Sequence, residues 1–233
     1  MNPDANFHPT QWTLVLRAAG HGAEAKAAMS DLCARYYGPV VAFLNRERDE
    51  DSARELAHTF FAQLLEGGLG APERERGKFR NFLLGALKHF LSKHRAASVA
   101  QKRGAGAEHV PMVDENETQP GFPVPSTVDD ALAFDREWAH TLIARALNAV
   151  EMEHNQKAEF FAALKPWLDG GATASQADAA RQLGMSETAV KVAIHRLRTR
   201  FRDLVRAEVS ATVNDPVDAA DELKHLISIV SRG

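Results

Sequence analysis

The sequence of 233 residues contains a single cysteine, Cys33, so it can form neither an intramolecular disulfide nor a cysteine-rich zinc site. No apolar run approaches the ~18 residues that a membrane-spanning helix needs. The first ten residues also lack the basic start and apolar stretch of a signal peptide. We therefore expect a cytoplasmic protein without membrane insertion, in which Cys33 is a buried structural thiol.

The usual patterns of catalysis are missing as well. His89 and His94 are five residues apart, whereas two metal ligands on one helix face are four apart. The glycines between positions 67 and 70 are not followed by the Lys-Ser/Thr of a phosphate-binding loop, and no strained nucleophile turn is evident. We expect no catalytic residue, no metal and no cofactor, and a function other than that of an enzyme.

Positive charge is not in excess overall, since the net charge is -3, but it is sorted into blocks. Residues 72–103 hold nine Lys and Arg against two acids, and residues 173–210 hold seven against four. Residues 104–139, between these blocks, hold one basic residue against eight acids. Two basic segments separated by an acidic one could contact phosphates at two places, although solvated helix faces would give the same pattern.

Prolines and acidic residues gather between positions 104 and 128, a composition that cannot bury enough apolar surface to order itself and indicates a linker. The patterns on both sides are helical. The predicted fold class is all-α, with two small helical domains (1–103 and 129–210), an acidic, Pro-rich linker (104–128) and a tail (211–233). Helices are expected at 12–17, 23–44, 50–66, 78–97, 129–152, 157–168, 175–183 and 186–209, with a weak amphipathic stretch at 219–229.

The strongest motif is a helix-turn-helix between Ser175 and Leu204. Ser175 can cap a short alanine-rich helix, Gly184 supplies the turn, and Ser186 can cap a second helix. Polar and basic side chains then follow on the outer faces of that second helix, where a recognition helix meets base edges and phosphates. The predicted DNA contacts are Thr188, Lys191 and His195 near bases, Arg181, Arg196 and Arg200 near phosphates, and Ser186 at the helix start.

With these residues the chain resembles the extracytoplasmic-function sigma factors, the two-domain members of the sigma-70 family. Leu183 to Phe201 looks like their C-terminal domain, which reads the -35 promoter element and docks on the flap of the polymerase β subunit. Asp31 to Leu44, Ser52 to Glu66 and Gly77 to Ala96 are similar to their N-terminal domain, in the same order and spacing. The resemblance implies a monomeric sigma factor that joins core RNA polymerase and promoter DNA, with a sigma region 2-like domain at 1–103 and a sigma region 4-like domain at 129–210.

The resemblance also assigns roles within the N-terminal half. It implies that the 52–66 helix binds the clamp helices of the β′ subunit through Arg54, Glu55, His58, Thr59 and Gln63. It implies that the next helix melts and holds the -10 element. There aromatic and cationic side chains alternate in a way that suits unstacked bases and a single-stranded backbone: Phe79, Arg80, Lys88, His89, Lys93 and Arg95.

The polymerase-binding helix departs from the family pattern. Arg54 replaces one of the usual acids, and Thr59 occupies a position where glutamate is common. A phosphate on Thr59 would restore about -1.5 to -2 charges, and one sigma subgroup linked to Ser/Thr kinases has a phosphorylated threonine in this helix. We therefore predict that phosphorylation of Thr59 turns on polymerase binding. A diverged helix with a merely exposed Thr59 is the alternative.

Other interpretations remain. A conventional helix-turn-helix regulator would bind a duplex operator alone, usually as a dimer, and a protein-only adaptor would not need the basic helix. An anti-sigma factor is a further possible partner. The acidic tail from Asn214 could cover a basic DNA-binding face, remain disordered or dock a partner.

Overall fold

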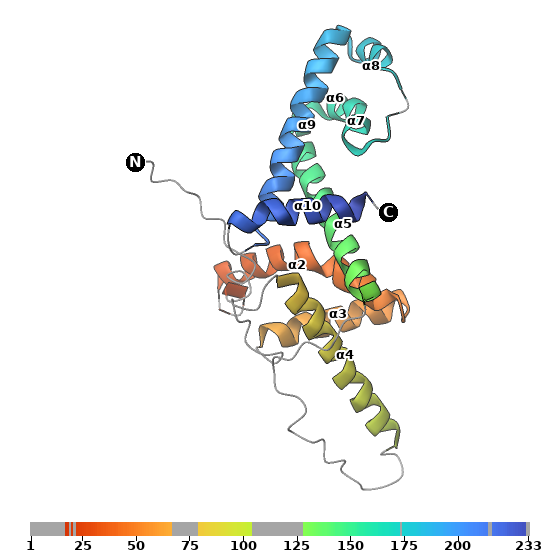
Figure 1. The fold of residues 1–233 in the computed structure, drawn as a ribbon, viewed down its shortest axis with the longest axis vertical. Helices are drawn as coiled ribbons and strands as arrows, with labels where there is room; N and C mark the ends of the chain where they lie inside the picture. The colour runs from red at the N-terminus through yellow and green to blue at the C-terminus, as the bar shows by residue number, and fades with distance from the viewer. Residues whose placement is uncertain are drawn as a thin grey trace, which may run out of the picture. The chain divides into compact units, whose positions relative to one another are not determined.

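The computed structural model describes residues 17–18, 20, 22–66, 79–103, 128–172, 174–213 and 216–231. Every regular element among them is a helix, so the all-α prediction is confirmed for this part of the chain (Figure 1). The expected helix at 12–17 lies outside the described residues except for Arg17, and the linker expected at 104–128 lies outside them except for Val128, which begins α5. The elements are α2 (Ala23–Asn45), α3 (Glu50–Leu65), α4 (Phe79–Arg103), α5 (Val128–Glu153), η2 (Asn155–Lys157), α6 (Ala158–Leu164), α7 (Pro166–Asp169), α8 (Gln176–Leu183), α9 (Glu187–Ser210), η3 (Pro216–Asp218) and α10 (Ala219–Val230).

These helices form two compact units whose limits differ from the predicted domains. The first unit contains the chain up to Ala139 and again from Ala211, so it includes the start of α5 and the whole of α10. The second unit runs from His140 to Ser210. The tail that we treated as separate from both domains therefore belongs to the first unit.

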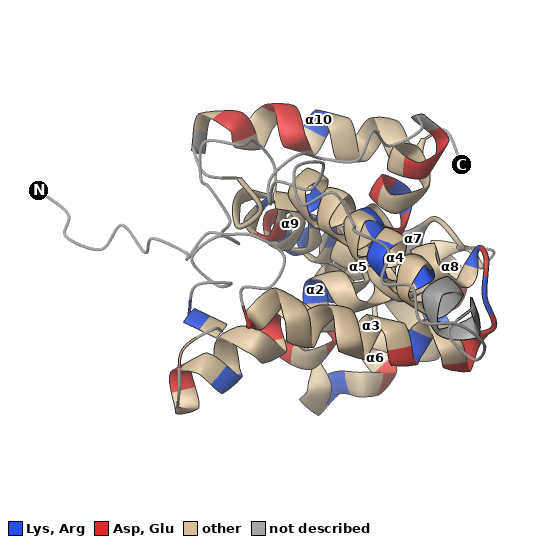
Figure 2. Ribbon diagram, turned by 90° about the horizontal axis from the view of Figure 1, so that it is seen from below, with Lys and Arg blue, Asp and Glu red and all other residues tan. Residues whose placement is uncertain are grey.

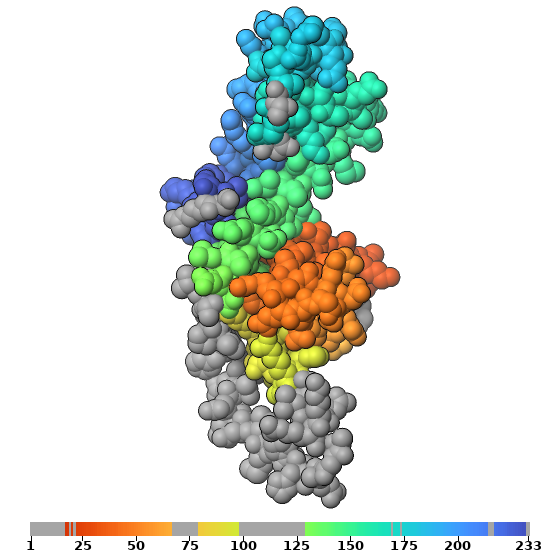
Figure 3. All heavy atoms as spheres, turned by 90° about the vertical axis from the view of Figure 1, so that its right-hand side faces the viewer, coloured from red at the N-terminus to blue at the C-terminus, as the bar shows by residue number. Residues whose placement is uncertain are grey.

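The first unit has an aromatic core built from α2, α3, α4 and the start of α5. Tyr36 meets Phe79 edge-on at 5.1 Å between ring centroids, and Phe60 meets Phe90 at 5.6 Å. Each of these four rings is buried. The end of α2 also contacts α5 through the rings of Phe43 and Phe134. In Figure 3 the orange and green spheres of this unit lie against each other. Because three helices and part of a fourth share this core, the side chains on their outer faces have fixed positions.

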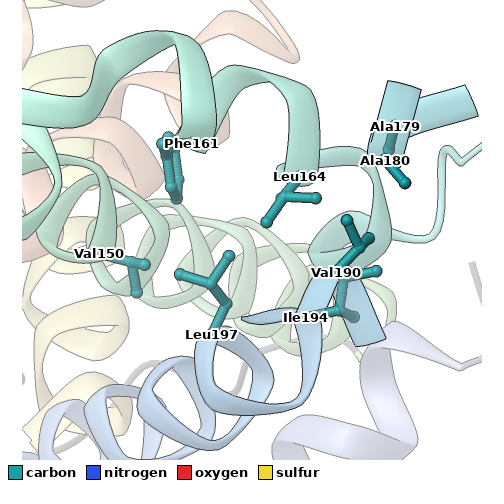
Figure 4. Close-up of a cluster of buried hydrophobic side chains, with 8 residues drawn as sticks. All are labelled: Val150, Phe161, Leu164, Ala179, Ala180, Val190, Ile194 and Leu197. Atoms are coloured by element: carbon teal, nitrogen blue, oxygen red, sulfur yellow. The ribbon is translucent and has the colours of Figure 1, made fainter. Parts of the chain in front are cut away.

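The second unit is built around an apolar core at the helix-turn-helix. Side chains from α5, α6, α8 and α9 converge on it (Figure 4): Val150, Phe161, Leu164, Ala179, Ala180, Val190, Ile194 and Leu197. The two alanines of α8 let that helix approach α9 closely, as their small size predicts. On α9 the buried positions recur in steps of four and three, which is the spacing of one helix face.

The single helix expected over 157–168 is divided in the structure. It begins with the short turn η2, continues as α6 and breaks at Lys165, after which α7 begins with Pro166. Proline has no amide hydrogen and crowds the carbonyl four residues earlier, so it starts helices more readily than it continues them. Periodicity alone did not reveal this break.

Candidate nucleic-acid interface

Two capped helices and a glycine turn define the helix-turn-helix of the second unit. The Ser175 hydroxyl accepts from the Asp178 amide at 3.1 Å, and the Asp178 carboxylate accepts from the Ser175 amide at 3.2 Å. Gly184 follows α8 with φ of 63°, the left-handed region that favours glycine. Ser186 then accepts from the Ala189 amide at 3.2 Å and caps α9. The local geometry is that of a helix-turn-helix.

The outer face of α9 is polar, basic and open to solvent. Figure 2 marks the basic positions of this helix in blue. Because Val190, Ile194 and Leu197 anchor the opposite face in the core, the outer side chains cannot rotate into the interior. Every residue predicted to contact the -35 element is exposed: Arg181, Ser186, Thr188, Lys191, His195, Arg196 and Arg200.

Two of these arginines already hold a carboxylate. Arg200 donates to Glu153 at 2.9 Å, and this hydrogen bond lowers the pKa of Glu153 and raises the pKa of Arg200. Arg181 forms an ion pair with Asp178. A DNA phosphate would have to compete with these carboxylates, whereas Lys191 and Arg196 have no ion-pair partner among the described residues.

A further arginine of α9 was not foreseen as a structural contact. Arg198 donates from Nε to the carbonyl oxygen of Trp167 at 3.0 Å. That carbonyl lies near the end of α7, so the bond ties α7 to α9 within the second unit. The sequence offered no signal that would distinguish Arg198 from the neighbouring arginines.

A cavity of about 730 Å³ lies beside α9 in the second unit. Its wall includes the apolar side chains of Phe160, Met185 and Val192. Lys157 and Arg196 line it as well and add positive charge. Ser186, Thr188 and Arg200 line it too, so the hollow is part of the face that carries the predicted -35 contacts.

On α4, the structure removes two of the predicted -10 residues from the surface. Phe79 is 0% and Arg80 4% exposed. Arg80 donates to Asp135 at 2.8 Å, forms an ion pair with Glu222 and lies over the Trp138 ring at 4.5 Å from its centroid. Aromatic and cationic alternation suggested DNA contacts here, but the same residue types build the core and its buried ion pair.

The remaining -10 candidates lie further along α4. Lys88 is mostly buried, with 12% of its side chain exposed, and forms an ion pair with Asp130, while Lys93 and Arg95 are exposed. His89 is half-buried, and this burial together with the charge of Lys93 lowers its pKa. Among the predicted residues, the helix can therefore present cations to DNA mainly from its C-terminal part, at Lys93 and Arg95.

The outer face of α3 carries the residues predicted to bind polymerase. Asp49 caps this helix by accepting from the Ser52 amide at 3.0 Å, which lowers the pKa of Asp49. Thr59 donates its hydroxyl to the Glu55 carbonyl at 3.0 Å, and His58 hydrogen-bonds Tyr37 at 3.0 Å. All of the predicted residues are exposed: Arg54, Glu55, His58, Thr59 and Gln63.

The tail contains a folded helix, α10, that packs within the first unit. Glu222, Leu226 and Ile229 are buried, and His225 hydrogen-bonds Asp135 at 2.7 Å. The weak amphipathic pattern at 219–229 located this helix. The sequence did not show that Glu222, an acidic residue in an acidic tail, would be buried against Arg80.

Among the described residues, no helix is both long enough and apolar enough to cross a membrane. Nor does any group of three or more His, Cys, Asp or Glu side chains in that part of the chain form a place for a metal ion. No protein-family model matches the chain, and no curated protein or solved structure matches it.

Proposed function

We propose that this chain is an RNA polymerase sigma factor of the extracytoplasmic-function type, which binds and positions rather than catalyses, in the cytoplasm. The observation that carries the proposal is the capped helix-turn-helix, in which every residue predicted to contact the -35 element is exposed. The order of α2, α3 and α4 before it supports the same proposal, since the resemblance rests on that order.

On this proposal α9 reads the -35 element. Among the predicted -35 contacts, Lys191 and Arg196 are the most available cations, because Arg181 and Arg200 are engaged with carboxylates. The exposed face of α3 binds the β′ clamp helices, and the C-terminal part of α4 contacts the -10 element.

Promoter-directed transcription by core polymerase tests the role of α9. Lys191→Ala with Arg196→Ala should abolish promoter output while polymerase binding remains. Arg206→Ala is a matched control, because Arg206 is exposed on the same helix beyond the predicted contacts and pairs only locally with Asp203. Equal output from the double variant and the control would contradict the assignment of α9.

Phosphorylation of Thr59 is the proposed activating step, by a Ser/Thr kinase. The side chains one turn away on α3 are Glu55, Leu56, Ala62 and Gln63, so no lysine or arginine of this helix face would neutralise a phosphate. The added charge of about -1.5 to -2 would therefore be presented to a basic surface of a partner.

A pull-down of core polymerase tests this step with unmodified protein, Thr59-phosphorylated protein and the Thr59→Ala variant. Binding should be strong only for the phosphorylated form, and Ala62→Glu, which adds charge one turn away, should not replace it. Equal binding by phosphorylated protein and Thr59→Ala would remove the switch and leave the sigma proposal standing.

A conventional helix-turn-helix regulator is the alternative. It predicts tight binding to a duplex operator by the chain alone and no complex with core polymerase.

A further inference from the structure

A second cluster of cations lies in the first unit, around a cavity of about 550 Å³. The end of α2 and the turn after it contribute Arg46 and Arg48, and α4 contributes Lys88 and Arg95. Neither Arg46 nor Arg48 is among the predicted DNA or polymerase contacts. Cavities of about 300 to 1,000 Å³ are typical of ligand sites.

The cavity keeps positive charge after its internal ion pairs are formed. Asp130 binds both Arg46, at 2.8 Å, and Lys88, and Glu47 binds Arg95. Four cations thus face two carboxylates, which leaves two positive charges in excess. Arg48 has no hydrogen-bond or ion-pair partner among the described residues. This excess of positive charge suits an anionic ligand.

One wall of the cavity is aromatic and aliphatic. Phe43 and Leu91 line it, and the Arg46 guanidinium lies over the Phe43 ring at 5.9 Å from the centroid. The ring of Phe43 contacts Phe134 edge-on, but the residue is only half-buried. Part of the Phe43 surface is therefore open to solvent. A ring beside several cations is the arrangement that holds an unstacked base and its phosphates.

We propose that this cavity is a nucleotide-binding subsite for single-stranded DNA, in which Phe43 stacks on a base and Arg48 and Arg95 bind the adjacent phosphates. The inference rests on the proposed function, because it extends the -10 surface of α4 to the end of α2. It also replaces Phe79 and Arg80, which are buried, with residues that line an accessible cavity. A rigid duplex would present its stacked bases to neither Phe43 nor Leu91, so the subsite selects the melted strand.

The test measures binding of a fluorescent single-stranded oligonucleotide by the full chain, without polymerase. All proteins carry Lys191→Ala and Arg196→Ala, so that α9 contributes little. Arg48→Glu should weaken binding at least tenfold. It should also make the negative slope of log affinity against log salt less steep, by about 0.7 for each phosphate that the protein no longer neutralises. Arg136→Glu reverses an arginine on α5 in the same unit that is more exposed than Arg48 and lies outside the cavity, and it should change binding less than twofold.

Phe43→Leu is a second variant that keeps an apolar side chain but removes the stacking ring. It should weaken strand binding about fivefold or more without changing the salt slope. Equal weakening by Arg48→Glu and Arg136→Glu would overturn the subsite, and so would unchanged binding by both Arg48→Glu and Phe43→Leu. Full displacement of the strand by inorganic phosphate at constant ionic strength would show an anion site without base binding, which also contradicts the proposal.

These outcomes are independent of the polymerase pull-down. If the chain does not bind polymerase but Arg48→Glu still weakens strand binding, the sigma proposal fails and the subsite stands. If the chain binds polymerase and Arg48→Glu binds the strand normally, the subsite alone fails.

Discussion

The buried ion pair between Arg80 and Glu222 should make α10 necessary for the stability of the first unit. Glu222 is 1% and Arg80 4% exposed, so neither charge can recover water without moving the helix. Removing one partner of a buried pair costs about 3 to 5 kcal/mol. Asp135 still binds Arg80 at 2.8 Å after Glu222→Gln, so we expect the lower end, about 3 kcal/mol.

Urea unfolding followed by tryptophan fluorescence measures this destabilisation, because the Trp138 ring lies directly beneath the Arg80 guanidinium. With a slope of about 1 to 3 kcal/mol/M, the midpoint should fall by about 1 to 3 M. Asp221→Asn is the matched control on the same helix. Asp221 is exposed and pairs with exposed Lys224, an interaction that solvent screens, so its loss should shift the midpoint little.

A double variant separates the ion pair from simple packing. If Glu222 acts through Arg80, the combined destabilisation from Arg80→Met and Glu222→Gln will be smaller than the sum of the two single effects. Equal midpoint shifts for Glu222→Gln and Asp221→Asn would refute the reasoning, as would strict additivity in the double variant.

Three further predictions concern individual side chains. Ser175→Ala removes the cap of α8 and should lower the free energy of unfolding of the second unit by about 1 kcal/mol, measured by thermal unfolding; an unchanged melting temperature would contradict it. Glu153→Gln should free Arg200 and strengthen promoter binding most at low salt, measured by titration of polymerase-bound protein; equal affinity would mean that the pair does not compete with phosphate. Burial and the charge of Lys93 lower the pKa of His89 in the folded chain. As pH falls through about 6.5, His89 therefore binds a proton in the unfolded chain before it does so in the folded chain, and the free energy of unfolding should decrease below that pH. His89→Gln should reduce this decrease in urea midpoints measured at about pH 7.5 and 5.5.

The helix-turn-helix could be predicted almost residue by residue because its signals are local. A capping serine, a glycine with positive φ and an apolar spacing each depend on neighbours within one or two turns. Ser175, Gly184 and Val190 therefore have the predicted roles in the structure. The exposure of the predicted contacts follows from the same spacing, which directs the apolar stripe inward.

Contacts between distant segments could not be predicted in this way. Arg80 and Glu222 are far apart in the sequence, and composition alone made one a candidate for DNA and the other part of an acidic tail. Burial converts both into one interior ion pair. At Pro166 the signal was local and visible, because proline favours the start of a helix. The prediction of one continuous helix followed the apolar pattern across this residue instead and was wrong.

The accessible cations of the first unit also depend on tertiary structure. Arg46 and Arg48 follow the end of a helix that is mainly core, so their sequence context indicates no ligand. Only the packing of α2 against α4 and α5 brings them beside Lys88 and Arg95.

Mapping of transcript starts made in vitro from genomic DNA tests the sigma proposal most directly. Core polymerase with Thr59-phosphorylated protein should start at a small set of positions that share sequence elements upstream. These starts should disappear with Lys191→Ala and Arg196→Ala. If neither unmodified nor phosphorylated protein changes the starts made by core polymerase, while the chain alone binds duplex DNA tightly, it is a conventional regulator and the central proposal is wrong.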